Sequence, residues 1–440
     1  MDKQTLYDLD IFTNDTESSS VYERIHRFTL TAGGKEALQR RMREPVFAYE
    51  QVCRNQRTIL HLIQHLEVWK KSFHAQEIQY LEDYLHSNIT PLQETDIFHI
   101  WLYRWRYPAD YAFLASSISR LAAFLQKLYP FSKALSEAGV AEVLTDLHQL
   151  IKQIYADEPK GWLMHAADDW LKPHQVFYLD HFIRFTHRKS FHFILDAFYE
   201  LDALFAMAEA TVEYQLVIPL LDKAGSRLAI KGLYHLFLPD AVRNDVYFDR
   251  DHPFIFLTGP NMAGKSTFLK ACGIAMYLAH LGMGIPAASA TIPVVDGLFT
   301  DIYVTDKIEK GYSYFFSEVQ RIRQLALELQ QGKRLFVLID EMFRGTNVQD
   351  AYDCSLAVVE KLMRFTNSYF LFASHLTELA YALQEHALIR FYCFDATVAH
   401  QQPCFSYRLK DGISSVRLGK IILEQEQVLA LLDARQDTTG

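Results

Sequence analysis

The residue types best suited to chemistry lie in a glycine-rich stretch near the middle of the sequence. Residues 259–266 read Gly-Pro-Asn-Met-Ala-Gly-Lys-Ser and fit the pattern G-x-x-x-x-G-K-[ST]. Glycines in such a loop let backbone N–H groups turn towards phosphate oxygens, and the N-terminus of the following helix adds a partial positive charge. The side chain of Lys265 would reach the β- and γ-phosphates, and the Ser266 hydroxyl would bind Mg²⁺. The stretch therefore predicts a nucleotide-binding site.

Two elements must position this loop, and the sequence supplies both. Residues 254–257 are a short apolar run rich in β-forming types, long enough for one buried strand. From Phe268 onward, apolar residues recur at helical spacing. The alternative is a glycine-rich turn that precedes a lysine by chance, and the strand–loop–helix order argues against it.

A second group of candidate residues follows another apolar run. Residues 335–339 read as a central parallel strand, and the acids Asp340 and Glu341 follow directly. In a phosphate-loop ATPase, the first of two such acids holds Mg²⁺ through its water shell and the second polarises the attacking water. A strand that ends in a solvated acidic turn is the alternative. The phosphate loop about 75 residues upstream makes that alternative the weaker one.

A histidine occupies a comparable position after a third apolar run. Residues 368–375 predict a buried strand, with His375 at its carboxyl end. Ligands of open α/β sheets gather at the carboxyl ends of the strands, so His375 can face the γ-phosphate. A lone histidine is more often structural, but its position and order along the chain favour the functional interpretation.

Other patterns in the second half are weaker. Gly311 and Ser313 precede an amphipathic helical pattern, but both residue types are ordinary at a helix N-terminus. Residues 391–397 and 404–409 predict edge strands, and residues 414–432 predict a final helical segment.

The first half of the sequence reads as mostly helical. Residues 8–12 look like a short strand or an extended segment, and helical spacing begins at Val21. Residues 190–214 contain neither proline nor glycine, and at about 1.5 Å per residue they predict a helix of nearly 40 Å. Aromatic residues alternate with arginine in residues 100–107, a composition that can bind single-stranded nucleic acid by stacking. We prefer the alternative, a helix-packing core with arginines that extend to solvent.

Composition limits the class of protein. The net charge is −9: residues 1–240 hold 25 Lys and Arg against 31 Asp and Glu, and the rest hold 19 against 22, so neither half is basic in bulk. A duplex-DNA clamp usually carries a basic footprint, although a local stripe can exist within a balanced total. The five cysteines form no C-x-x-C pair and read as buried thiols in a reducing compartment. No secretion signal or membrane span is expected, so the predicted location is the cytoplasm.

Taken together, these motifs resemble the MutS family of DNA mismatch-repair ATPases, which are built on an ABC-type nucleotide domain. The resemblance rests on Thr-Gly-Pro-Asn-Met-Ala-Gly-Lys-Ser-Thr at residues 258–267, on Leu-Ile-Asp-Glu-Met-Phe-Arg-Gly-Thr-Asn-Val-Gln-Asp at residues 338–350, and on Phe-Ala-Ser-His-Leu-Thr-Glu-Leu at residues 372–379. Upstream, Asn244-Asp245 and residues 31–45 are also similar to that family. The resemblance is strong over 240–420 and weaker over 75–190.

The resemblance implies a role for each matching residue. Glu341 would activate water, Lys265 would act on the transferred phosphate, and His375 would sense the γ-phosphate. Asp340 and Ser266 would serve Mg²⁺. Ser313 matches the signature loop, which in such dimers contacts the γ-phosphate bound by the other subunit, so the resemblance implies a homodimer with composite ATP sites. The residues implied to hold the phosphates are Gly259, Pro260, Asn261, Met262, Ala263, Gly264, Lys265, Ser266 and Thr267.

The resemblance also implies an architecture. We expect an α/β P-loop (ABC-type) ATPase domain over residues 231–440, preceded over residues 1–230 by a mostly α-helical core/lever domain. Within residues 75–190, the family's DNA clamp would be reduced or absent. We expect the chain to lack the family's mismatch-reading and connector domains, because the resemblance begins at the core domain.

Three positions depart from the family pattern. Tyr314 stands where the family usually has threonine in the signature. Ala241 lies near the position of the adenine-stacking aromatic residue, and Tyr407 is a guess for an alternative stacking platform.

Two functions of different classes fit these patterns. The first is a Mg²⁺-dependent ATP hydrolase whose cycle moves helical levers, with structured or branched DNA as the expected cargo, in repair or recombination but without mismatch reading. The alternative is a scaffold whose helical arms bind another protein, with ATP acting only as a conformational latch. Because phosphate contacts weaken steeply with salt, the salt dependence of DNA binding separates the two.

Overall fold

The computed structural model describes residues 1–12, 20–90, 97–137, 142–158, 160–168, 170–302, 314–399, 402–414, 416, 423–425 and 427–433. The chain divides into two compact units, each built from separate pieces of sequence. The first comprises residues 1–21, 43–52 and 214–440, and the second comprises residues 22–42 and 53–213. The simpler domain division between residues 230 and 231 stays a prediction.

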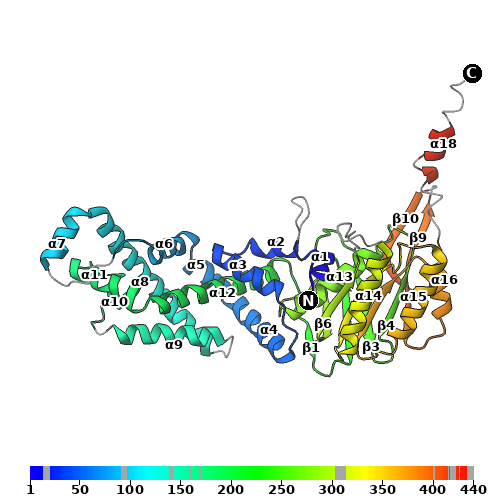
Figure 1. Cartoon of the computed structure of the whole chain (residues 1–440), viewed down its shortest axis with the longest axis horizontal. Helices are drawn as coiled ribbons and strands as arrows, with labels where there is room; N and C mark the ends of the chain where they lie inside the picture. Colours follow the sequence, from blue (N-terminus) through cyan, green and yellow to red (C-terminus); the bar gives the residue numbers. More distant parts are fainter. Residues whose placement is uncertain are drawn as a thin grey trace, which may run out of the picture. The chain divides into compact units, whose positions relative to one another are not determined.

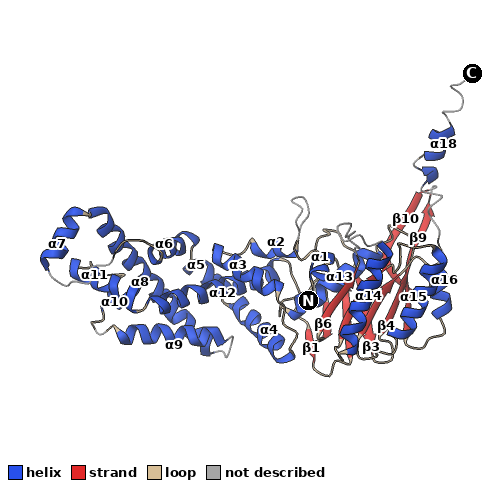
Figure 2. Cartoon of the chain, in the orientation of Figure 1, coloured by secondary structure: helices blue, strands red, loops and turns tan. Residues whose placement is uncertain are grey.

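The second unit consists of helices in its described residues, and the strands of the chain lie in the first unit (Figure 2). The predicted long helix is confirmed as α12 (Arg188–Glu213). The preceding helices, of which α2, α3 and α4 extend beyond this unit, are α2 (Val21–His26), α3 (Ala32–Arg43), α4 (Tyr49–Gln64), α5 (Leu66–Ser72), α6 (Ala75–Leu85), α7 (Ile97–Arg106), α8 (Pro108–Glu137), α9 (Glu142–Asp157), α10 (Trp162–His165), α11 (Pro173–His181) and the π-helical turn η1 (Phe182–Thr186).

Helix α12 is the core of the helical unit because many apolar side chains on it are buried, together with the polar Asp202 and Thr211. Phe205 stacks on Trp69 of α5 with ring centroids 4.2 Å apart. Asp202 is fully buried and accepts hydrogen bonds from the Leu30 and Thr31 N–H groups, each at 2.8 Å. Its carboxylate therefore satisfies donors at the start of α3, where helices need a capping acceptor. A Cβ at Gly34 would lie 2.0 Å from this carboxylate, which explains the glycine.

The preferred interpretation of residues 100–107 is wrong for most of their aromatic side chains. On α7, Trp101 and Trp105 are 60% and 72% exposed, and Phe98 is 63% exposed. With Leu102 these residues follow i, i+3, i+4, i+7 spacing, so the apolar face of α7 lies on the surface of the unit. Arg104 and Arg106 are exposed as well. The stacking interpretation therefore remains open.

The first unit contains a six-stranded sheet with the order β10-β9-β4-β8-β7-β6, in which every neighbouring pair except β10/β9 is parallel. A four-stranded sheet has the order β1-β5-β2-β3. The strands are β1 (Leu220–Asp222), β2 (Arg227–Leu233), β3 (Asn244–Asp249), β4 (Phe254–Thr258), β5 (Ser289–Pro293), β6 (Gly297–Asp301), β7 (Leu335–Asp340), β8 (Tyr369–Ala373), β9 (Ile389–Ala399) and β10 (Gln402–Asp411). The helices of this unit include α1 (Lys3–Asp8), α13 (Lys265–His280), α14 (Tyr314–Gln330), α15 (Val348–Leu362), α16 (Thr377–Leu383) and α18 (Val428–Asp433) (Figure 1).

Three predicted strands are confirmed as central parallel strands. Every residue of β4, β7 and β8 is buried, as expected for strands covered on both faces. Phe254 and Phe256 pack in one core with residues of α14, α15 and α16, and helix α13 packs against β6, β7 and β8. The prediction of two edge strands is half wrong: β10 is at the edge, but β9 pairs with β4 inside the sheet.

The N-terminal residues form helix α1 against the edge strand β6, followed by a turn, which corrects the prediction of a short strand or extended segment over residues 8–12. Helix α1 ends at Asp8, and Leu9 and Ile11 are fully buried. The Asp8 carboxylate accepts hydrogen bonds from the Thr300 hydroxyl at 2.7 Å and from the Ile302 N–H at 3.0 Å. These hydrogen bonds offset the free-energy cost of removing the Asp8 carboxylate from water when the N-terminal segment is buried. Of the predicted C-terminal helical segment, α18 is described and residues 415, 417–422 and 426 lie outside the described part.

Asp301, beside this contact, should make the stability of the protein fall as pH rises. Burial raises the pKa of Asp301 to about 7, with Arg321 opposing and Asp8 adding to the shift. Between pH 4 and 7 the folded state then holds a proton that the unfolded chain releases, so the free energy of unfolding falls across that window. In urea unfolding, Asp301→Asn should remove on the order of 3 kcal/mol of this pH dependence. The exposed Asp251→Asn control should unfold as the parent does at each pH; a wild-type pH slope in Asp301→Asn would contradict the assignment.

The cysteine and membrane expectations have different outcomes. All five cysteines are free thiols; Cys272 and Cys393 are buried, but Cys404 is exposed, so the expectation of uniformly buried thiols is wrong. Across the described ranges, no helix is both long and apolar enough to cross a bilayer.

Candidate nucleotide site

The glycine-rich loop connects β4 to α13, and its backbone needs two of its glycines. Gly259 has φ 144°, and a Cβ there would lie 2.6 Å from the carbonyl oxygen of Phe394. Gly264 has φ 103° and immediately precedes the first residue of α13. Both conformations are open to glycine and costly for other residues. The first N–H groups of α13 have no partners within the helix, so they are available to an anion at this end.

Lys265 is buried within this loop, with 5% of its surface exposed. Its Nζ donates hydrogen bonds to the carbonyl oxygens of Gly259 at 2.8 Å and Pro260 at 3.3 Å. Burial lowers the pKa of Lys265, and the charges of Glu341 and Asp340 partly oppose this. The ammonium group is therefore held at the loop by acceptors that phosphate oxygens can replace.

Ser266 and Asp340 meet directly, although they are distant in sequence. The Ser266 hydroxyl donates a short hydrogen bond to Asp340 Oδ2 at the end of β7. Burial raises the pKa of Asp340, and the hydrogen bond from Ser266 and the charge of Arg344 oppose this. A hydroxyl and a carboxylate are hard oxygen ligands, and Mg²⁺ is commonly bound by one or two such groups together with substrate phosphates. The pair therefore fits Mg²⁺.

Glu341 lies beside His375, which follows strand β8. His375 Nδ1 is 3.3 Å from Glu341 Oε1. Burial alone would raise the pKa of Glu341, but the hydrogen bond and charge of His375, with Arg344 and Lys265, outweigh it and lower the pKa. The hydrogen bond to Glu341 raises the pKa of His375. Glu341 is thus a carboxylate at neutral pH and can accept a proton.

Arg344 is a further charged group at this site. Its Nε lies 3.4 Å from Glu341 Oε2, and its guanidinium donates a short hydrogen bond to the carbonyl oxygen of Asp340. Sequence reasoning did not select Arg344 as a site residue. The spacing of three residues between Glu341 and Arg344 could have suggested a contact between them. That contact depends on the shape of the intervening turn, which is set by tertiary packing.

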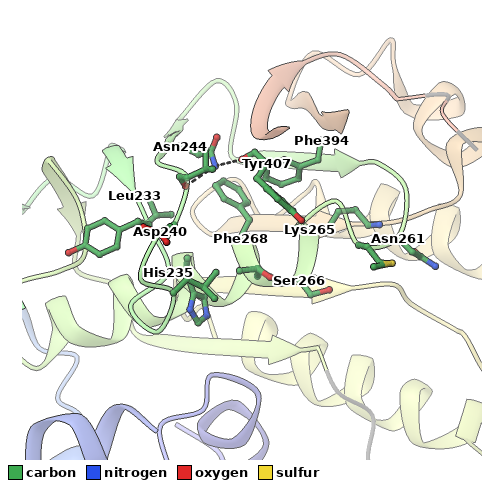
Figure 3. A pocket seen from close by; sticks show the side chains of 18 of the residues that line it. Leu233, His235, Asp240, Asn244, Asn261, Lys265, Ser266, Phe268, Phe394 and Tyr407 are labelled. Atoms are coloured by element: carbon green, nitrogen blue, oxygen red, sulfur yellow. Dashed lines mark hydrogen bonds between the residues drawn. The ribbon is translucent and has the colours of Figure 1, made fainter. Parts of the chain in front are cut away.

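The loop opens into a cavity of about 700 Å³, a size suited to a nucleotide. Figure 3 shows Leu233, His235 and Asp240 at one side of this cavity and Lys265 and Asn261 at the other. The cavity lining also includes Ser266, Thr267, Phe268, Phe394, Tyr407, Ala241 and Glu341.

Tyr407 forms part of the cavity wall next to the glycine-rich loop. A Cβ at Gly264 would lie 3.3 Å from Tyr407 Cδ1, so the ring lies close over the start of α13. Asn244 donates to the Tyr407 carbonyl oxygen at 2.9 Å and accepts from the Leu409 N–H at 2.7 Å, which fixes the irregular backbone of β10 here (Figure 3). An exposed ring at this position can stack on a flat ligand.

The structure brings together most residues that the sequence predicts for the site. Lys265, Ser266, Asp340, Glu341 and His375 meet at the carboxyl ends of β4, β7 and β8, as the topology of parallel sheets requires. Gly311 and the predicted trans residue Ser313 lie outside the described residues, and so does the side chain of Tyr314. The roles of all these residues stay predictions.

Comparisons with known proteins find similarity to one named family. Residues 255–429 match the family model described as MutS domain V. The chain is 33% identical over 226 residues to the DNA mismatch repair protein MutS of Anaplasma phagocytophilum, covering 51% of this chain and 27% of that protein. It is 35% identical over 191 residues to the same-named protein of Thermotoga maritima, covering 42% and 23%. For Persephonella marina the identity is 33% over 237 residues, covering 52% and 27%. The matches thus span about a quarter of the length of these curated relatives.

Proposed function

We propose, from the premise that this chain belongs to the MutS family, that it is a Mg²⁺-dependent ATP hydrolase. The observation that carries the proposal is the convergence of four groups at the mouth of one cavity. The Lys265 ammonium, the Ser266–Asp340 pair and the Glu341 carboxylate come from separate segments of sequence. A purely structural turn has no need of this combination of a buried cation and two acids.

Each group has a distinct task in the proposed reaction. The loop from Gly259 to Thr267 binds the phosphates through its N–H groups, and Lys265 turns from the loop carbonyls to the β- and γ-phosphates. Ser266 and Asp340 hold Mg²⁺, which supplies charge neutralisation at the phosphates when bound. Glu341 orients the attacking water and takes its proton. His375 fixes the Glu341 carboxylate, and His375 also faces the γ-phosphate.

ATP turnover by the purified chain tests this proposal. Phosphate release should require ATP and Mg²⁺ together, and chelation of the metal should stop it. An ATP-latched scaffold would instead bind ATP with the same metal dependence but release no phosphate. Binding without turnover in a sample that is free of inhibitors would therefore favour the scaffold.

We also propose that the chain works as a dimer with shared ATP sites and that the helical unit moves with the ATP cycle. Support comes from the family relationship and from the division of the chain into a helical unit and an α/β unit. Sedimentation with and without ATP and Mg²⁺ tests the dimer. The expected result is a dimer that is stabilised by ATP and lost after hydrolysis.

Binding by the helical unit has support in the exposed face of α7. Phe98, Trp101, Leu102 and Trp105 cover this face, and Arg104 and Arg106 lie beside them. DNA is the cargo that we propose, because the relatives are named as DNA mismatch repair proteins. Binding of branched and linear DNA should weaken steeply between about 50 and 200 mM salt, the range over which phosphate contacts lose affinity. Retention of a protein partner with no affinity for either DNA would favour the scaffold.

Tyr407 should provide a stacking surface for the adenine base of the nucleotide. Replacing it by alanine removes the ring, and stacking of one base on an aromatic side chain contributes about 1–3 kcal/mol. Tyr407→Ala should therefore weaken ATP binding about tenfold or more, while Tyr407→Phe keeps wild-type affinity. Inorganic triphosphate, which has no base, should bind all three proteins equally. An equal loss for triphosphate would show that the ring supports the phosphate loop instead.

A further inference from the structure

We propose that Glu318 of α14 is a positioning residue for Glu341, because it holds the turn that presents the Glu341 carboxylate. The inference rests on the proposed ATP hydrolysis and deepens it, since it assigns a control point outside the cavity. Glu318 does not line the cavity, and sequence reasoning gave it no role.

The turn after β7 has an unusual backbone. Glu341 has φ 62° and Phe343 has φ 60°, in the left-handed region that residues with a Cβ rarely occupy. Such conformations persist only where the surroundings hold them, and they concentrate at functional sites. On one side the turn is held by the Glu341 N–H, which donates to the Ala373 carbonyl oxygen at 2.9 Å.

Glu318 holds the other side of this turn. Its Oε1 accepts a hydrogen bond from the Arg344 N–H at 3.0 Å, and its Oε2 accepts one from the Gly345 N–H at 3.2 Å. Only 2% of Glu318 is exposed, so its carboxylate depends on such partners. Burial raises the pKa of Glu318, and the two N–H groups oppose this, as does the Arg344 charge.

Arg344 connects Glu318 to the end of strand β7 and to Glu341. Its backbone is fixed by Glu318, while its guanidinium contacts the Glu341 carboxylate and the carbonyl oxygens of Asp340 and Glu341. A shift of the Arg344 backbone would move the cation that lies 3.4 Å from Glu341 Oε2. The orientation of the proposed base therefore depends on a carboxylate that does not touch it.

Helix α14 is a firm support for Glu318. Arg321, three residues later on α14, donates to the Thr300 carbonyl oxygen of β6 and to Asp2. Phe315 packs on Phe343 of the turn, with ring centroids 5.6 Å apart. The helix is thus fixed to the edge of the sheet and packed against the turn. Because α14 follows the predicted signature residue Ser313 directly, any displacement of its first turns would reach Glu341 through Glu318.

Glu318→Gln tests the proposal because it keeps the volume of the side chain and replaces one acceptor by an N–H group that faces a backbone donor. We expect kcat for ATP to fall roughly tenfold while the ATP dissociation constant stays within about twofold, as for a group that acts on the reacting geometry alone. Glu318→Ala, which removes both acceptors, should lower kcat further. The matched control is Glu328→Gln on the same helix, whose side chain pairs with Lys333 at 3.3 Å; it should turn over as wild type.

The outcomes separate this inference from the proposed function. Wild-type kcat in Glu318→Gln, together with loss of turnover in Glu341→Gln, would overturn the inference and leave the ATPase standing. Equal losses in kcat and ATP affinity would also overturn it, because they indicate general damage to the unit. If Glu341→Gln turned over normally, the proposed function and the inference would both fall. Should Glu318→Gln fail to fold, Glu318→Asp, which keeps both acceptors on a shorter stem, carries the same comparison.

Discussion

Lys265→Ala should abolish ATP binding at micromolar concentrations and leave the fold intact. The variant removes the one buried ammonium group that faces the phosphate end of the cavity among the described residues. We expect the dissociation constant to rise at least about a hundredfold, equivalent to about 2.7 kcal/mol. Equilibrium binding of a fluorescent ATP analogue measures this directly.

Thermal stability distinguishes this effect from unfolding. Lys265→Ala loses the two hydrogen bonds from Nζ to the loop carbonyls, so a single cooperative melting transition without nucleotide is the sign that the variant remains folded. The exposed Lys231→Ala on β2 is the control and should bind ATP normally. Unchanged ATP affinity in Lys265→Ala would contradict the assignment of the phosphate loop.

Glu341→Gln should bind ATP normally and hydrolyse it hardly at all. The amide has the same shape as the carboxylate but cannot take a proton from water, and general-base contributions amount to about 10²–10⁴ in rate. Because the pKa of Glu341 is lowered, the wild-type residue is already ionised at neutral pH, so ionisation of this group should not increase the wild-type rate as the pH is raised above neutral. Single-turnover phosphate release with saturating ATP and Mg²⁺ is the measurement.

Glu341→Gln should accumulate in the ATP-bound state of the cycle. If two bound ATP molecules join the subunits, as we propose, the variant will run as a dimer in ATP and Mg²⁺ and as a smaller species in ADP. Glu360→Gln, an exposed position on α15, serves as the control. Turnover at the wild-type rate in Glu341→Gln would mean that another group activates the water.

The parts of the fold that the sequence predicted well are those with strong local patterns. Strands β4, β7 and β8 are continuous apolar runs because both of their faces are buried, and such runs are legible without tertiary information. The acids Asp340 and Glu341 at the end of β7 and His375 after β8 then lie close together because parallel strands end at the same edge. The surface position of α7 could not be predicted, because apolar residues at helical spacing indicate an apolar face but not whether another element covers it.

Residues that act through tertiary contacts were missed for a related reason. Arg344 gains its position from a turn with left-handed residues at Glu341 and Phe343, and Glu318 of α14 matters only because it contacts that turn. Glutamate and phenylalanine are not residue types that indicate a left-handed conformation. Residues 8–12 were wrongly predicted as a strand or extended segment, because their burial at the end of α1 depends on strand β6, which is far away in the sequence. Local propensity carries no information about such a partner.

The discontinuity of the α/β unit has a consequence for synthesis on the ribosome. Asp8 meets Thr300 only after 292 further residues have been made, and by then the whole helical unit has been synthesised. Until then, the side chains of Leu9 and Ile11 lack the neighbours that bury them in the folded protein. Exposed apolar residues of this kind can cause a nascent chain to aggregate or to be bound by chaperones. Pairings between distant segments of this kind also form slowly. Mutations in α1 or in residues 9–12 should therefore lower the yield of folded protein on expression more than the small size of this segment would suggest.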